Sequence, residues 1–596
     1  MRFFQKTVIS LMIAASLTAC SDNKNEKKES ATTEAVVTSQ AKTSDKFSEM
    51  LAYVPADTAY LMANSVAVPD DVLEFQMKRF QMLVSALSAN IKSITDVANK
   101  MPSEDSDSSA STEAKETSDA TKEATKEEPN AGDFIKALLQ EFSTNLNKDG
   151  LAKLGLKFNG HSMFYALDML PVIRYELANK EAFKALLSKA EKTSGYKLEW
   201  SKCGEHDCLV SKKGKELNIA TVFVGDHVAI APFSSEKKQQ VMDHLLGTKK
   251  PEKSYKVADW NTFVSENGYK GYGEGFVKLN TMLGKLEQFL LTKTKQEQGD
   301  SFDEQAFKGC FAVVKAHTKN VPELVFGIKE LSEKAIKYEV VVKTAPEVST
   351  VLQGLPNKLT DMKQPTNPIF TLGVNMNMPN LRNALTQYVN FLATSGEEHK
   401  CAAINPVELR KSIGGLAMAM TMGASQFKSI FVALDNLELD NNGKPSKVEA
   451  FGTVVADDPM ALLQMLAMVN PQFATLQLPD NGKPVKLPVG VIPAGLVSPE
   501  LSLSRQGRLL NMFVGNDQMA LEPISVKENT IFWNVTDSKR YYGLMNKVIE
   551  QAPETKGEKT KEVMEVMNAL GEFSGVMSQQ IGFDKRGVVL DYSISY

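Results

Sequence analysis

The sequence predicts an α+β protein built from two tandem duplicated domains, each with a mostly antiparallel sheet and helices packed on one face. Strand-like segments alternate with helix-like segments along most of the chain. Turn-forming sequences such as DNNGKP at 440–445 and PDNGKP at 479–484 favour hairpins between neighbouring strands. Several motifs of the first half recur in the same order in the second half, which indicates an internal duplication.

Both predicted domains open with the same kind of segment. A loop at 55–60 leads into the strand-like LMANSVAV and then, after Pro69, into a helix that begins DDVLEFQMKRF. A loop at 365–370 leads into TLGVNMNM and, after Pro379, into the helical NLRNALTQYV. Proline suits the first turn of a helix, because the N–H that it lacks has no partner within the helix there. We therefore expect a strand followed by a helix at the start of each domain.

Further matches follow in order along the two halves. SMFYALD resembles SIFVALD and aligns Ala166 with Ala433, and FVGD resembles FVGN and aligns Phe223 with Phe513. Between these motifs, VIRYELA and FGTVVAD each precede a helix that begins after Asn179 or Asp458. Both residues suit the N-cap position, because their side chains accept a hydrogen bond from the first turn. Lastly, 276–290 parallels 532–550 as a strand followed by a helix.

Three long strands are expected at the end of the first domain, with the sequences FAVVKAHT at 311–318, ELVFGIKEL at 323–331 and AIKYEVVVK at 335–343. The segment 573–596 looks like the same sheet edge in the second domain. We therefore place the first repeat at 46–345, a linker at 346–365 and the second repeat at 366–596.

Two segments lack the apolar residues that a folded core needs. Residues 20–45 and the acidic insert 102–132 are rich in Lys, Glu, Ser, Thr and Ala, and they bury too little surface to offset chain entropy. The first is predicted to be a lipidated disordered tether. For the insert, a tolerated surface insertion is favoured over a binding tail.

The N-terminus has the pattern of a secretory signal at 1–19. Arg2 and Lys6 precede an apolar stretch, too short to span a bilayer, that ends in Leu17-Thr18-Ala19-Cys20. This ending resembles the bacterial lipobox. The resemblance implies a diacylglycerol thioether and an N-acyl chain, usually palmitate, on Cys20, which anchors the protein to a membrane. Ser21 after it implies the outer membrane of a Gram-negative bacterium, with the periplasmic face favoured. The alternative is an ordinary signal peptide with a chance cysteine.

Cys203, Cys208, Cys310 and Cys401 are the cysteines that remain, an even number in an oxidising compartment. Cys203 and Cys208 flank a turn-like Gly-Glu-His-Asp, so we expect a disulfide that closes a hairpin. Cys310 and Cys401 then pair by elimination. Two alternatives remain open, namely a metal site formed by Cys203, His206 and Cys208, and separate buried thiols at Cys310 and Cys401.

No catalytic motif is present, so we expect a protein that is not an enzyme and needs no cofactor or metal. Gly299-Asp300-Ser301 resembles an esterase motif but lies in a polar stretch that predicts a loop, and Asp440-Asn441-Asn442-Gly443 lacks the spacing of a calcium loop. The net charge of −4 argues against a nucleic-acid partner. Methionines on one face of a predicted strand and on a predicted helix suit a plastic core, with a Cu(I) site or an adaptable surface for lipid or peptide as the alternatives; they are Met418, Met420 and Met422, and Met460, Met465 and Met468. A cavity for an apolar ligand would be lined by Met376, Met418 and Met420.

The lipobox, the Pro-Ala-Asp-Thr opening and the repeated pattern together resemble uncharacterised bacterial envelope proteins. That resemblance transfers no catalytic residue. The sequence favours a non-enzymatic envelope lipoprotein that binds an unknown protein partner or assists assembly. The alternative is a carrier or receptor for an apolar ligand in a cavity lined by methionine, and a hydrolase is a distant third.

Overall fold

The structure is a computed structural model. The residues it describes are 44–100, 131–213, 217–359, 361–398, 401, 408, 411–412, 415, 427–440, 445–487, 500–551 and 558–596. Cys20, the signal peptide, almost all of the predicted tether and most of the acidic insert lie outside the described residues.

The first half supplies the elements α2 (Asp45–Leu51), β1 (Tyr60–Asn64), α3 (Asp70–Lys100), α4 (Ala131–Thr144), α5 (Lys148–Lys153), β2 (Ser162–Leu167), β3 (Leu170–Glu176), α6 (Lys180–Ser194), β4 (Trp200–Cys203), β5 (His206–Lys213), β6 (Leu217–Val224), β7 (His227–Phe233), α7 (Lys238–Leu246), α8 (Val257–Glu266), β8 (Tyr272–Lys278), α9 (Leu279–Gln298), η2 (Gly299–Ser301), α10 (Glu304–Asn320), β9 (Glu323–Leu331) and β10 (Ala335–Lys343).

The second half supplies α11 (Pro346–Gln353), β11 (Lys363–Pro365), β12 (Phe370–Asn375), α12 (Met378–Glu398), β13 (Phe427–Leu439), β14 (Pro445–Ala456), α14 (Pro459–Val469), η4 (Pro471–Thr475), β15 (Val485–Lys486), β16 (Leu501–Gln506), β17 (Leu509–Val514), β18 (Leu521–Pro523), β19 (Thr530–Asp537), α15 (Ser538–Gln551), α16 (Glu558–Ser574), β20 (Val576–Asp584) and β21 (Gly587–Ser595).

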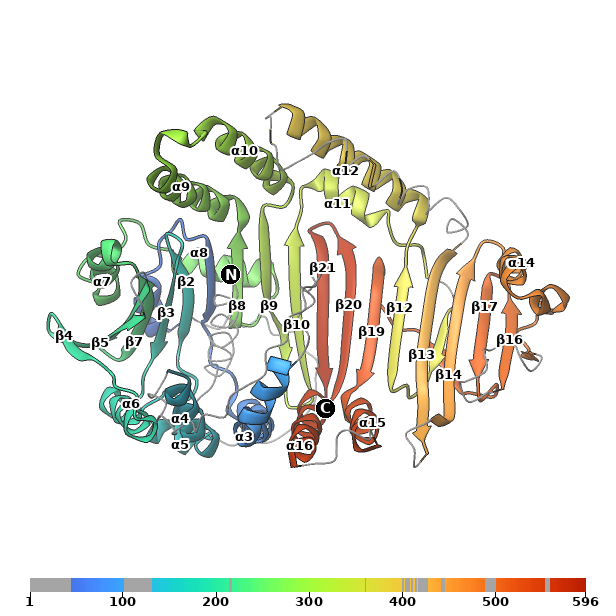
Figure 1. Ribbon diagram of the computed structural model, residues 1–596, viewed down its shortest axis with the longest axis horizontal. Coiled ribbons are helices and arrows are strands. Elements are labelled where there is room, and N and C mark those ends of the chain that lie inside the picture. The colour runs from blue at the N-terminus through green and yellow to red at the C-terminus, as the bar shows by residue number, and fades with distance from the viewer. Residues whose placement is uncertain are drawn as a thin grey trace, which may run out of the picture.

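All the strands except β11 and β18 belong to one continuous sheet of 19 strands (Figure 1). Every neighbouring pair is antiparallel, in the order β4-β5-β6-β7-β3-β2-β1-β8-β9-β10-β21-β20-β19-β12-β13-β14-β17-β16-β15. The predicted α+β class with a mostly antiparallel sheet is confirmed.

The two halves of the sheet have the same strand order. From the outside to the centre, β6-β7-β3-β2-β1-β8-β9-β10 in the first half corresponds to β16-β17-β14-β13-β12-β19-β20-β21 in the second. The pairing register also agrees, because Leu61 faces Tyr165 and Phe276 where Thr371 faces Ala433 and Val535. This agreement is what a duplication would produce, although common ancestry of the halves stays a prediction.

The halves meet along β10 and β21. Their register is symmetric about the pair Glu339 and Asp591, with Ala335 opposite Ser595 at one end and Lys343 opposite Gly587 at the other. The two predicted domains therefore share one sheet through main-chain hydrogen bonds. The predicted linker at 346–365 contains α11 and β11, and β11 pairs with β18 to form a separate two-stranded ribbon.

One predicted strand is wrong. The segment 311–318 lies within helix α10, whereas 323–331 and 335–343 are the strands β9 and β10. The side chain of Asp303 accepts a hydrogen bond from the N–H of Ala306 and caps this helix. Apolar residues at 307, 310, 311 and 314 recur with the helical spacing, which outweighs the β-branched run at Val313 and Val314.

Two of the predicted residue matches between the halves are also wrong. Phe223 lies on β6, but Phe513 lies on β17, whose counterpart in the sheet is β7. Ala166 and Ala433 lie on corresponding strands, but Ala433 matches Tyr165 by pairing register. A shift of one residue along a strand moves a side chain to the other face of the sheet. Residues that match in sequence here therefore point to opposite faces of the sheet.

Helices gather beyond both ends of the strands in Figure 1, with α9, α10 and α12 on one side and α3, α15 and α16 on the other. Three more helices, α2, α7 and α8, pack their apolar side chains against one face of the first half. On the same face of the second half, the chain around β11 and β18 covers an aromatic cluster that contains Phe431 and Trp533. Among the described residues, no helix has the length and apolar character needed to cross a membrane.

Candidate functional site

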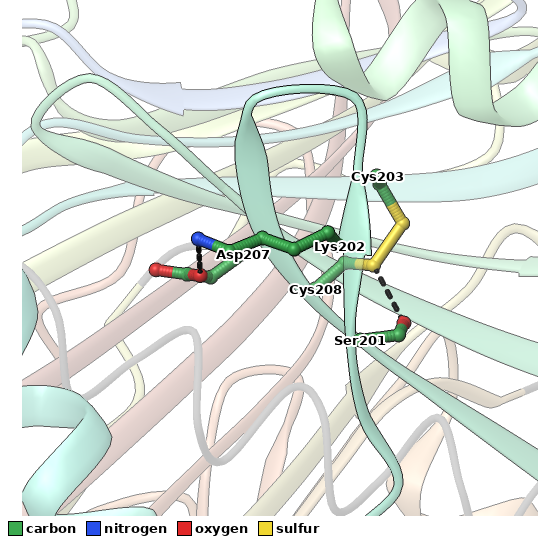
Figure 2. The surroundings of a disulfide bond; sticks show 5 residues. All are labelled: Ser201, Lys202, Cys203, Asp207 and Cys208. Atoms are coloured by element: carbon green, nitrogen blue, oxygen red, sulfur yellow. Dashed lines mark hydrogen bonds and ion pairs between the residues drawn. A yellow bond between two sulfur atoms is a disulfide. The ribbon is translucent and has the colours of Figure 1, made fainter.

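The first predicted disulfide is present and closes the β4–β5 hairpin (Figure 2). The Cα atoms of Cys203 and Cys208 lie 5.9 Å apart, and the Ser201 hydroxyl lies 3.0 Å from the Cys208 sulfur. Lys202 pairs with the Asp207 carboxylate across the same hairpin. Because the two sulfurs are bonded to each other, they are not thiolate ligands for the alternative metal site with His206.

The second predicted disulfide joins the halves. Cys310 on α10 and Cys401 beyond α12 have Cα atoms 4.7 Å apart, within the range of disulfides. The alternative of separate thiols at these positions is therefore wrong. In the described part of the chain, no cluster of three or more His, Cys, Asp or Glu residues has the arrangement of a metal site.

The other sequence candidates are not brought together. Met376 is half-buried between β12 and α12, while Met418 and Met420 lie outside the described residues. Gly299, Asp300 and Ser301 form the short turn η2 between α9 and α10. The calcium-like sequence at 440–443 lies outside the described residues except for its first position.

A buried polar cluster surrounds Arg174, which has no exposed surface. Its guanidinium bonds to the hydroxyl of Tyr165 at 3.0 Å, to Nε2 of His227 at 2.8 Å and to the carbonyls of His244 and Leu245. Burial, reinforced by the positive charge of Arg174, lowers the pKa of His227 and of His244 to about 4. Each of the three guanidinium nitrogens has a partner within the protein, so this cluster holds the sheet to α7.

A cavity of about 730 Å³ lies between the loops 356–363 and 523–529. Asn375 lies in its wall, buried, and its amide nitrogen donates to the carbonyls of Asn357 and Thr530 at 2.7 and 3.0 Å. Its amide oxygen accepts from the hydroxyl of Ser429 at 3.0 Å. The buried amide is fully used within the protein, so it fixes the loop at 356–363 rather than presenting a group to a ligand.

The feature with the clearest chemical character is one face of the sheet, which we call the uncharged face. In an antiparallel sheet, directly opposite residues point to the same side. Following these pairs across the sheet gives a row of apolar residues: Ile230, Ile173, Phe164, Met62, Gly275, Phe326, Val340, Leu590, Ile581, Phe532, Val374, Ile430, Val454 and Leu510.

The adjacent row on the uncharged face is also without charge. It runs through Ile328, Tyr338, Tyr592, Gln579, Asn534, Leu372, Val432, Gly452 and Met512. The buried ionic groups Arg174, Glu274 and Glu339 lie on the opposite face. Beyond Leu510 the first row continues to Arg505 near the edge of the sheet, which pairs with Asp480. Between Ile230 and Leu510, one side of the sheet therefore carries the charged networks, and the other carries apolar side chains with a few uncharged polar ones.

Helices cover the uncharged face at its two ends. Phe183 and Leu187 of α6 pack near Tyr175 in the first half, and Leu463 of α14 packs near Leu510 in the second. Between these ends, in the view of Figure 1, α3 overlaps the lower end of β9, and the strands from β10 to β13 have no helix in front of most of their length. Val374, Ile430 and Val432 keep 39, 44 and 41% of their surface exposed.

Sequence reasoning missed this face because each strand carries apolar residues on both sides, which reads as a strand buried on both faces. Only the pairing of residues far apart, such as Val340 with Leu590, places them in one row. No protein-family model matches the chain, and neither a curated protein nor a solved structure matches it.

Proposed function

We propose that this chain is a lipid-anchored envelope protein that binds the acyl chains of a lipid on its uncharged face. The observation that carries the proposal is the continuous apolar row that crosses the seam between the halves, in which Val374 and Ile430 on β12 and β13 stay exposed. Soluble monomers rarely expose a large contiguous apolar surface, and such surfaces usually mark binding sites.

The chemistry of the face favours acyl chains as its occupant. Hydrocarbon chains need no hydrogen-bond partner, and burying each CH₂ contributes about 0.8 kcal/mol. The rows offer few polar groups, chiefly Gln579, Asn534 and the two tyrosine hydroxyls. The proposal keeps the apolar-ligand function but replaces the methionine cavity with the sheet face.

The predicted location of the protein is consistent with this proposed function. A lipid chain on Cys20 would hold the protein at the periplasmic face of the outer membrane, next to a supply of lipids. Cys20→Ser should release the protein from the membrane fraction of cells. If this variant stays in the outer membrane, the predicted lipid anchor at Cys20 is wrong, but the proposal of ligand binding on the uncharged face is unaffected.

The binding proposal is tested on the soluble Cys20→Ser chain with a fluorescent fatty acid. Val432→Asp should lower the affinity at least about tenfold, because a carboxylate would lose its water when the chain binds. Val351→Asp on α11 is the matched control, since Val351 and Val432 are both 41% exposed. The control should bind like the parent protein.

The proposal is contradicted if the parent chain does not bind the fatty acid, or if the two variants bind it equally well. It is also contradicted if envelope extracts yield a stable, lipid-free complex of the parent chain with another protein, and if Val432→Asp abolishes that complex. The last result would restore the protein-binding function on the same face.

A further inference from the structure

The uncharged face has a polar part where the two halves of the sheet meet. The pairing places four polar residues next to one another across β10, β21, β20 and β19, namely Tyr338, Tyr592, Gln579 and Asn534. We call these four residues the polar strip. All four are half-buried, and their strands lie near the middle of the sheet (Figure 1).

The hydrogen-bonding groups of the polar strip are largely unused within the protein. No hydrogen bond joins the side chain of Asn534, Gln579 or Tyr338 to another described residue. The Oδ1 atom of Asn534 is nevertheless buried, which is costly for a polar atom without a partner. The Tyr592 hydroxyl donates to Sδ of Met577 at 3.0 Å, and a thioether is a weak acceptor. The strip therefore keeps hydrogen-bonding capacity that a ligand could use.

The first half of the sheet shows that the fold does not require polar residues at these positions. The residues that match Asn534, Gln579 and Tyr592 by pairing register are Gly275, Phe326 and Val340. The same strand pairing thus forms with apolar side chains in one half and with polar side chains in the other. The polar side chains therefore serve a purpose other than the pairing of the strands.

Beyond Asn534, both rows of the uncharged face continue with exposed apolar side chains. Val374 and Ile430 follow in one row, with 39 and 44% of their surface exposed. Val432 and Met512 follow in the other row, with 41 and 40% exposed. A molecule lying across these strands would meet hydrogen-bonding groups at one end and two apolar rows at the other.

We propose that the polar strip binds the ester end of an uncharged glycerolipid, whose acyl chains lie on the two apolar rows over β12 and β13. This inference rests on the lipid-binding function proposed above and names the class of lipid. Ester carbonyls accept hydrogen bonds, and the amide nitrogens of Asn534 and Gln579 donate them. The terminal torsion of an amide side chain is soft, so Asn534 can turn its nitrogen toward the open face.

The spacing and the charge of the face agree with this ligand. Asn534 and Gln579 lie directly opposite each other on adjacent strands, where Cβ atoms are about 5 Å apart. They can therefore reach two esters on neighbouring glycerol carbons. The rows between Ile230 and Leu510 contain no lysine or arginine. A carboxylate or phosphate would lose its water there without gaining a charged partner.

The test uses the soluble Cys20→Ser chain with the fluorescent fatty acid bound, and measures its displacement by dioctanoylglycerol or by the dioctyl ether of glycerol. The ether has similar chains but lacks the ester carbonyls. The parent chain should bind the ester at least about fivefold more tightly than the ether, because two hydrogen bonds to the carbonyls are gained. Asn534→Leu combined with Gln579→Leu should remove this preference by weakening the binding of the ester.

The matched control makes the same two changes at Asn383 and Gln387, which are exposed on α12. This control should keep the preference of the parent chain. Gln579→Phe is a second variant, which copies Phe326 of the first half and is therefore compatible with the sheet. It should reduce the preference for the ester. Urea unfolding of each variant checks that the fold is retained.

The inference is overturned if the parent chain binds the ester and the ether equally well, or if the Asn534 and Gln579 variants keep the preference. It is also overturned if dioctanoyl phosphatidic acid binds more tightly than dioctanoylglycerol, because the ligand would then be anionic. In each of these cases the fatty acid still binds, so the proposed function stands. A parent chain that binds neither the fatty acid nor the glycerolipids would refute lipid binding itself, and this inference with it.

Discussion

Arg174 on β3 and Thr453 on β14 occupy matching places in the two halves of the sheet. Around Arg174 the first half has Tyr165 and His227 joined by hydrogen bonds. The second half has Ala433 and Leu509 at the matching positions, within the apolar cluster of Phe431 and Trp533. The same strand order is thus compatible with a polar network or with an aromatic core.

The difference shows what determines this fold. Alternation of apolar residues and the order of pairing are common to both halves, whereas individual contacts are not. Three sets of substitutions test how far the two halves differ.

The largest effect is expected from the disulfide that joins the halves. Replacing Cys310 and Cys401 by serine should lower the free energy of unfolding by about 4–5 kcal/mol in the chain-entropy model, because the closed loop spans 91 residues. The same change at Cys203 and Cys208, only 5 residues apart, should cost about 2 kcal/mol. Urea unfolding of the oxidised protein measures both values. Equal losses would mean that the loop length does not control the effect.

Arg174→Ala should lower the free energy of unfolding by roughly 3–5 kcal/mol, because it leaves a cavity and removes the hydrogen bonds to Nε2 of His227 and to the carbonyl of Leu245. Thr453→Val should change it by less than about 1 kcal/mol and in the stabilising direction, because the buried Thr453 hydroxyl has no hydrogen-bond partner. Chemical denaturation compares the two variants at one pH. Similar losses would contradict the contrast between the halves.

The histidines of the first half predict a loss of stability in acid. Their pKa of about 4 in the folded chain lies below the usual 6.5, so the unfolded chain binds more protons between these values. Stability is complete above about pH 6.5 and falls as the pH drops toward 4, by roughly 2–3 kcal/mol for each histidine. His227→Gln combined with His244→Gln should flatten the pH dependence in that window. An unchanged slope would assign the acid sensitivity to other groups.

Local patterns were sufficient for much of this fold. The strands β9 and β10, the N-caps Asn179 and Asp458 and both disulfides follow from residues close in sequence or from cysteine number. Helix α10 was missed because Val313 and Val314 favour a strand locally, while its cap at Asp303 lies well before them. The continuous sheet and the uncharged face depend on pairings such as Phe326 with Val340 and Val340 with Leu590. Val340 and Leu590 are far apart in the sequence, so no local pattern relates them.

The seam between β10 and β21 also sets the order in which this chain completes its sheet. β21 comes after all the other strands of the sheet in the sequence, yet it lies near the middle of the sheet. During synthesis, the edge of β10 has no partner strand until the whole second half has been added. An unpaired edge invites pairing with other chains, and the joining of distant strands is slow. We therefore expect misassembly to occur mainly in the interval before β21 pairs with the edge of β10.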